Sequence, residues 1–203
     1  VEVTGDLTVG TAMTVAAGTN DYNVSILGAT NSIAGNTTFA NTGNLTVEGI
    51  TTFAAGATKA TIGVKSFSGT INATTGNLNF GTAGSVTIPA SATFNPAAGT
   101  LTLTTTTVAA SQTLSLGSGN ASIINTGAIS GLAASANLTI NTTGVATIGA
   151  VGTNIGIVTV TQSGGTTFAS LDAATFAITD TADTMTVEVT GDLTVGTAMT
   201  VAA

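Results

Sequence analysis

The chain lacks most of the side chains that perform chemistry in proteins. Its 203 residues include no cysteine, histidine, tryptophan or arginine, and only two lysines, Lys59 and Lys65. Without histidine or cysteine there is no basis for a zinc, copper, haem or iron–sulfur site, a thiol nucleophile or an imidazole base. The net charge of −7 would repel a nucleic-acid backbone, and it excludes a basic membrane-surface anchor. We therefore expect no cofactor and no nucleic-acid partner.

Charge and long apolar runs are also scarce. Charged residues are 5% of the chain, yet hydrophobic residues are 43%, whereas disordered chains show the opposite balance. Thr, Ser, Asn or Gly interrupts every apolar stretch well short of the roughly 20 residues of a membrane helix. The chain opens on an acidic, strand-like segment and not on the basic region and apolar core of a signal peptide. We expect a packed segment of a longer protein with no membrane insertion.

The most informative feature is a perfect duplication. Residues 1–17 read VEVTGDLTVGTAMTVAA, and residues 187–203 repeat the same seventeen letters. Such an identity indicates a tandem array in which one period runs from Val1 to Thr186. The domain prediction is one repeat unit at 1–186, followed at 187–203 by the start of the next identical unit.

Short strands are predicted throughout. Apolar-Thr-apolar triplets such as Leu45-Thr46-Val47, Val86-Thr87-Ile88 and Leu138-Thr139-Ile140 alternate with a period of two. That period places the apolar residues on one face of a strand and Thr on the other. Turn-forming pairs such as Gly43-Asn44 and Gly164-Gly165 separate the triplets, and no window keeps a helical period. The chain is predicted to be all-β, with about 25 strands.

Two all-β architectures fit this pattern. A parallel β-solenoid (β-helix) suits strands of three to four residues, small corner residues and low charge, because like charges stacked coil on coil would repel each other. We favour this solenoid, continuous between tandem units. The alternative is an antiparallel β-sandwich whose units exchange a donor strand.

The coil length has two readings. Three strands of about seven residues predict about 20 residues per coil and about nine coils per period. Five almost evenly spaced phenylalanines suggest a flatter, two-strand coil with Phe stacked on Phe; they are Phe39, Phe53, Phe67, Phe80 and Phe94. We favour the longer coil.

The texture of the sequence resembles a known group. The segments are TGNLTV at 42–47, TGNLNF at 75–80, TLTLTTTT at 100–107 and ASQTLSLG at 110–117. They resemble giant repetitive surface proteins of bacteria, the filamentous-haemagglutinin-like and autotransporter-like adhesins. The resemblance implies right-handed parallel β-helices and a role in extracellular adhesion or fibre building. Perfect repetition is unusual in that group and points instead to a polymer-like array.

Acidic residues supply the only candidate site. They gather toward the two ends of the unit, with Glu2, Asp6 and Asp21 at the first. Those at the second are weak calcium candidates, namely Asp172, Asp180, Asp183, Glu188 and Asp192. The competing interpretation is a solvated acidic band, since no EF-hand loop or calcium-binding nonapeptide repeat is present. A glycosidase carboxylate pair is disfavoured because the chain has one tyrosine and no tryptophan to hold a sugar.

Two further surface patterns occur. Asn-x-Ser/Thr sequons make glycans a possible partner; they are at Asn23, Asn36, Asn44, Asn72, Asn120, Asn137 and Asn141. Outward Thr rows resemble those of ice-binding solenoids, and Thr102, Thr104 and Thr106 form the one long row in the sequence. We interpret Thr as the ordinary polar partner on a strand.

These features predict a structural protein. The chain is expected to be a non-enzymatic repeat of an extracellular filament or cell-surface fibre, with copies of itself end to end as partners. The alternative is the stalk of a surface adhesin whose binding tip lies outside this segment.

The duplicated segment gives a specific structural expectation. Leu193, Val195 and Met199 should face the core as Leu7, Val9 and Met13 do, with Thr194 and Thr200 facing outward. The two copies should superpose after a translation along the fibre, with at most a small rotation.

Overall fold

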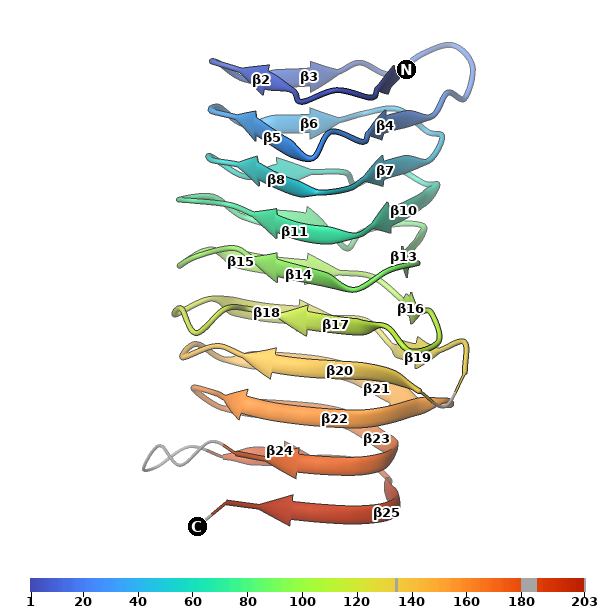
Figure 1. The fold of residues 1–203 in the computed structure, drawn as a ribbon, viewed down its shortest axis with the longest axis vertical. Helices are drawn as coiled ribbons and strands as arrows, with labels where there is room; N and C mark the ends of the chain where they lie inside the picture. The colour runs from blue at the N-terminus through green and yellow to red at the C-terminus, as the bar shows by residue number, and fades with distance from the viewer. Residues whose placement is uncertain (134, 180–185, 203) are drawn as a thin grey trace.

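The computed structural model describes residues 1–133, 135–179 and 186–202. The described chain is a parallel β-solenoid of about nine turns in which no helix occurs. Its coils stack along the long axis of the molecule, with the first coil at one end and the last at the other (Figure 1). Every strand pairs in parallel with the strand one coil away, which excludes the antiparallel sandwich for the described residues.

Each coil has three sides, which we call faces A, B and C in the order the chain visits them. Face A contains β1 (Glu2–Val3), β4 (Val24–Ile26), β7 (Leu45–Val47), β10 (Val64–Phe67), β13 (Ser85–Ile88), β16 (Thr106–Val108) and β19 (Ile129–Gly131). Face B contains β2 (Thr8–Val9), β5 (Thr30–Ile33), β8 (Ile50–Phe53), β11 (Gly69–Asn72), β14 (Ala92–Asn95), β17 (Thr113–Leu116), β20 (Ala136–Asn141) and β22 (Ile155–Gln162). Face C contains β3 (Met13–Val15), β6 (Thr37–Phe39), β9 (Ala57–Thr58), β12 (Leu78–Phe80), β15 (Thr100–Leu103), β18 (Ile123–Thr126) and β24 (Val187–Val189).

Toward the C-terminus the strands lengthen and run around corners. β21 (Ala146–Gly152) covers faces C and A, β23 (Thr166–Ile178) covers C, A and B, and β25 (Leu193–Val201) covers A and B. On face A, a ladder of paired residues leads from Val24 to Leu193 in eight coil-to-coil steps. The average coil therefore contains about 21 residues, which confirms the three-strand prediction.

The core is a narrow axial column of apolar side chains. Alternate residues of each strand point inward, so that Leu45 and Val47 are buried while Thr46 between them is half-buried on the outside. Because the strands pair in register, each inward residue stacks on an inward residue of the next coil. The core therefore depends on contacts between neighbouring coils, as in other solenoids.

The phenylalanines show why the two-strand coil was wrong. Phe39, Phe53 and Phe67 lie on faces C, B and A in turn, because the step between them is about two thirds of a coil. All are buried, and the rings of Phe39 and Phe53 contact each other from different faces, so they do not form a one-face stack. Phe67 contacts the rings of Phe80 and Phe94 with centroid distances of 4.7 and 5.1 Å.

The corners are tight and use small or amide side chains. Gly69 has a φ of 83°, and a Cβ there would come within 2.3 Å of the Gly49 carbonyl oxygen in the coil before it. Asn side chains satisfy corner N–H groups across coils. The Asn23 Oδ1 accepts from the Asn44 N–H at 2.8 Å, and the Asn44 Oδ1 accepts from the Val64 N–H at 2.9 Å.

Candidate functional site: the duplicated segment at the two ends

The first copy of the seventeen-residue segment forms the first coil. Its VEV part lies on face A, its LTV part on face B and its MTV part on face C. The second coil covers it, since β4, β5 and β6 pair with β1, β2 and β3. Leu7, Val9 and Met13 are partly buried and pack against the core.

The second copy forms the last coil but occupies different faces. Its VEV part, β24, pairs with the face C part of β23, and its LTV part pairs with the face A part. Its MTV part pairs with the face B part of β23. Each part of the segment has therefore moved by one face, and the expectation of a small rotation is wrong.

The physical reason for this shift is that the number of residues in the period is not a whole multiple of the number of residues in one coil. The period, residues 1–186, contains about 8⅔ coils of about 21 residues, so it ends a third of a turn short of nine complete turns. A slip of one residue would bring outward side chains into the core, so the in-register ladders hold this phase in place.

Side-chain orientation in the second copy follows the prediction. Leu193 and Met199 are in register with the buried Leu171 and Phe176, so they are on the inner side of the strand. Thr194 is in register with the exposed Asp172, on the outer side. Likewise, Val195 is in register with the buried Ala173 and Thr200 with the half-buried Ala177.

These inward residues nevertheless remain uncovered. Leu193, Met199 and Val201 are 46%, 52% and 58% exposed, because no coil of the described chain stacks beyond the last one along the axis. An open strand edge with inward apolar side chains is a surface on which another strand can pair. The end of the solenoid is thus the strongest candidate for an interaction site.

The calcium candidates are only partly brought together. Asp172 and Asp192 line one groove of about 290 Å³ on face A, together with Ser170 and Thr194. Glu188 is on face C, and Asp180 and Asp183 lie outside the described residues. Across the described ranges, no group of three or more His, Cys, Asp or Glu side chains is arranged to hold a metal ion. Calcium binding stays an untested prediction.

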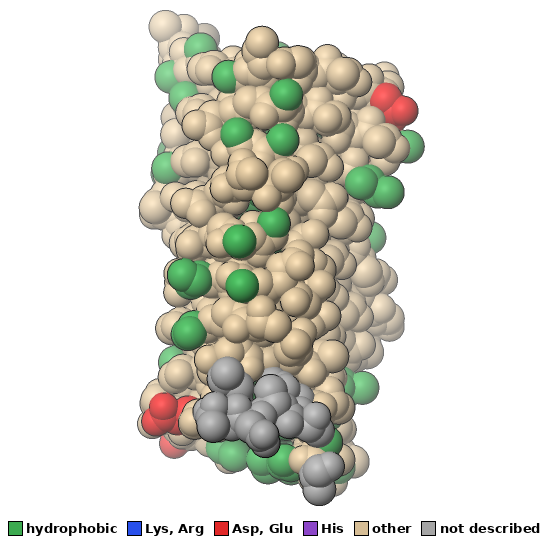
Figure 2. Space-filling view, turned by 90° about the vertical axis from the view of Figure 1, so that its left-hand side faces the viewer, with side chains coloured by type: hydrophobic (Ala, Val, Ile, Leu, Met, Phe, Trp, Pro, Cys, Tyr) green, Lys and Arg blue, Asp and Glu red, His purple; other side chains and the backbone are tan. Residues whose placement is uncertain are grey.

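At the other end, two of the three acids have structural partners. The Asp6 Oδ1 accepts from the Thr30 N–H at 2.9 Å, and Asp21 accepts a hydrogen bond from the Thr42 hydroxyl. In the view of Figure 2, acidic side chains are seen only toward the two ends of the solenoid, and the surface between them is uncharged.

Sequence reasoning missed a buried pair of cations. Lys59 and Lys65, the only basic side chains of the chain, are fully buried in the solenoid. Lys65 occupies an inward position of face A between Leu45 and Val86. The signal was present in the strand period, since Lys65 lies two residues before the inward Phe67 and therefore on the same side of the strand.

Both ammonium groups are satisfied by neutral oxygens of the corner between faces C and A. The Lys59 Nζ donates to the Asn41 carbonyl oxygen at 2.6 Å and to the Thr61 Oγ1 at 2.7 Å, and the Lys65 Nζ donates to the Ala83 carbonyl oxygen. Desolvation by burial, together with the positive charge of Lys65, lowers the pKa of Lys59 to about 8. Burial also lowers the pKa of Lys65.

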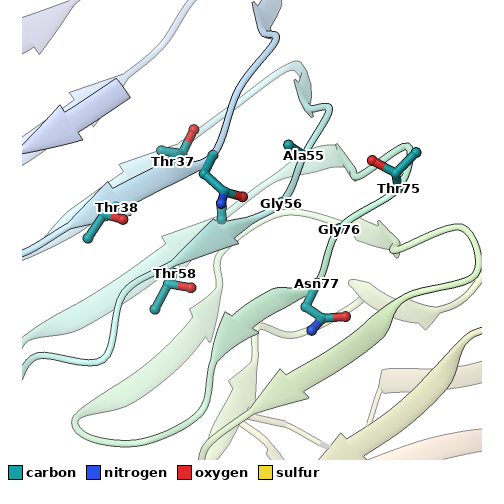
Figure 3. Close-up of a pocket in the computed structure, with 10 residues that line it drawn as sticks. Thr37, Thr38, Ala55, Gly56, Thr58, Thr75, Gly76 and Asn77 are labelled. Atoms are coloured by element: carbon teal, nitrogen blue, oxygen red, sulfur yellow. The ribbon is translucent and has the colours of Figure 1, made fainter. Parts of the chain in front are cut away.

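A polar groove of about 300 Å³ lies along the corner between faces B and C (Figure 3). Thr37 and Thr38 of β6, Thr58 of β9 and Asn77 line it, with Gly76 among the backbone segments. The Thr37 hydroxyl is buried and, among the described side chains, is the one buried polar group without a hydrogen-bond partner. The groove has neutral hydrogen-bonding groups and offers no catalytic acid or base.

The threonine row suggested by the sequence does not exist as a surface row. Thr102 is on face C, whereas Thr106 is on face A and its side chain is buried. Outward rows instead run from coil to coil. The row on face C is Thr14, Thr38, Thr58, Asn79, Thr102, Asn125, Thr147 and Thr167.

Several sequon asparagines hold neighbouring coils together. Beyond Asn23 and Asn44, the Asn137 Oδ1 accepts from the Ile157 N–H at 3.0 Å. The Asn95 Nδ2 donates to the Asn72 Oδ1 at 3.3 Å, and the Asn120 Nδ2 donates to the Asn95 Oδ1 at 3.2 Å. These bonds give the amides a structural role, and glycosylation stays an untested prediction.

Comparison with known proteins adds no relative. No family model matches the chain, and no curated protein and no solved structure shows significant similarity to it. Within the described ranges there is no helix long and apolar enough to cross a membrane. The structure confirms a β-helical repeat architecture, and the sequence resemblance to adhesins stands without a family match.

Proposed function

We propose that the chain is one period of a continuous β-solenoid fibre with a structural and non-enzymatic role. The observation that carries this proposal is that the duplicated segment forms a complete coil at each end. At the first end, the coil formed by β4, β5 and β6 covers it. An identical segment at the other end presents the same pairing groups, so a next period can continue the ladder there.

Burial supports the same proposal. Leu193 and Met199 of the last coil are about half exposed, whereas their counterparts Leu7 and Met13 are partly buried under the second coil. Continuation of the ladder would remove this apolar surface and the unpaired strand edge from water together. The fibre would be stabilised by the sum of its coil-to-coil contacts.

An extracellular or cell-surface location is part of the proposal. It is supported by the resemblance of the sequence texture to bacterial surface adhesins. The same resemblance supports a second candidate function, in which the solenoid is the stalk of an adhesin with its binding tip elsewhere. Many identical periods in the parent protein favour the fibre, and a few periods followed by a distinct domain favour the stalk.

Small-angle X-ray scattering of chains with one, two and three periods tests continuity. With a coil spacing of about 4.8 Å, each added period should lengthen the particle by about 42 Å at constant cross-section. Folded units joined by flexible linkers would give a variable length and a scattering curve of separate beads, and that result would contradict the fibre.

A further inference from the structure

We propose that successive periods of the fibre are related by a screw, each turned by a third of a revolution about the axis relative to the one before. This inference rests on the proposed continuous fibre. Its basis is the shift of the duplicated segment from faces A, B and C at the first end to faces C, A and B at the last.

The occupant of the open end is a copy of residues 18–39. In the first coil, Glu2 is in register with Ser25, Thr8 with Ser32 and Thr14 with Thr38. Because the last coil has the same sequence, the next period should repeat these pairs, each on the face that precedes the original one in the order A, B, C. The second period's copy of Ser25 would then lie beside Glu188 on face C.

The corners make such a turned continuation possible. Strand-to-strand connections vary from coil to coil on all three sides, from the single residue between β10 and β11 to the eight residues between β3 and β4. No side of the solenoid requires one corner length, so the same sequence can turn at any of them. What continues through the junction is the in-register pairing and the inward–outward alternation.

The screw determines how the fibre presents its surface. Three periods, about 26 coils and about 125 Å at 4.8 Å per coil, return a given residue to the same side. The exposed apolar pair Ile123 and Val145 of face C, and the acidic groove around Asp172, would each appear on three sides in turn. A ligand of any such patch could therefore bind on each of the three sides of the fibre.

Cross-linking of cysteine pairs tests the turn, because the chain has no cysteine of its own. The first variant is Asp172→Cys with Thr194→Cys, two exposed positions in register on face A. The comparison variant is Thr179→Cys with Thr194→Cys. Thr179 is exposed and directly follows the face B end of β23, beside which Thr194 would lie if the second copy kept the faces of the first.

A short bifunctional thiol reagent such as dibromobimane should link the first pair rapidly and the comparison pair at least about tenfold more slowly, as read by fluorescence and mass. In denaturant this preference should disappear, and the two rates should agree within about twofold. Preferential linking of Thr179→Cys with Thr194→Cys, or no preference in the folded chain, would overturn the screw.

Continuity is tested separately in a two-period chain that carries Glu188→Cys in the first period and Ser25→Cys in the second. Rapid linking of this pair supports the continuous ladder. If it fails while Asp172→Cys still links to Thr194→Cys, the proposed fibre is overturned, and the screw falls with it. If it succeeds while the Asp172 pair fails, the fibre stands and only the turn is refuted.

Discussion

The two buried lysines predict that the protein becomes more stable as the pH rises from 8 to 10.5. The pKa of Lys59 is about 8 in the folded chain, against 10.5 for an ordinary lysine, because burial and Lys65 disfavour its charged form. Between these two values the unfolded chain binds more protons than the folded chain. The free energy of unfolding therefore rises with pH across this window and is constant below it as far as Lys59 is concerned.

The magnitude follows from how far the pKa is lowered. A pKa difference of about 2.5 corresponds to about 3 kcal/mol at 1.36 kcal/mol per unit. Lys65, whose pKa is also lowered by burial, acts in the same direction. For a chain of about 200 residues, 3 kcal/mol corresponds to an increase of about 6 to 12 °C in Tm.

Urea unfolding followed by circular dichroism between pH 7 and 10.5 measures this rise. The matched control is Lys59→Met, which keeps an unbranched side chain at the site but removes the charge. It should be more stable than the parent at pH 7, where the parent must bury a cation, and its rise with pH should be reduced to the share of Lys65. A free energy of unfolding that stays level or falls from pH 8 to 10.5 in the parent would refute the reasoning.

Two packing predictions follow from the core and the corners. Phe94→Ala should lower the free energy of unfolding by about 3 to 5 kcal/mol because the ring is fully buried against Phe67 and Phe80. Thr93→Ala, on the outer side of the same strand, should change it by less than about 1 kcal/mol. Equal costs in urea titrations would contradict the assignment of inner and outer sides. Gly76→Ala should lower the free energy of unfolding by at least about 2 kcal/mol because its Cβ would lie 1.9 Å from the Ala55 carbonyl oxygen. Gly152→Ala, where a Cβ meets open space, should leave Tm almost unchanged. An unchanged Tm for Gly76→Ala would show that this corner is loosely packed.

Much of the fold could be read from the strand period. Alternation of Thr with Leu, Val, Ile and Phe predicted the strands and which side chains face inward, because a pleated strand places neighbours on opposite faces whatever surrounds it. Tight turn residues between short strands predicted a solenoid of about 20 residues per coil. The same rule held at the junction, where Thr194 is on the outer side and Leu193 on the inner side.

The candidate site was less predictable. The duplication identified the segment, but its position around the solenoid depends on the length of every corner before it, and corner lengths vary without a sequence rule. The even spacing of the phenylalanines misled for the same reason, since a step along the chain becomes an angle only when the coil length is known. Lys59 and Lys65 were missed as core residues because a buried ammonium is acceptable only where corner carbonyl groups converge on it.

The sequence by itself determined the local geometry of this protein, namely short strands and inward apolar residues, and it showed that residues 1–17 recur at 187–203. The first two depend on neighbours along the chain, such as the Thr46 between Leu45 and Val47. Only the tertiary structure decided which strands share a face, where the two lysines find their oxygens and that the second copy begins a third of a turn out of phase with the first. The phase of the second copy is a sum over the corner lengths of many coils, and such a sum has no signature in any single stretch of residues.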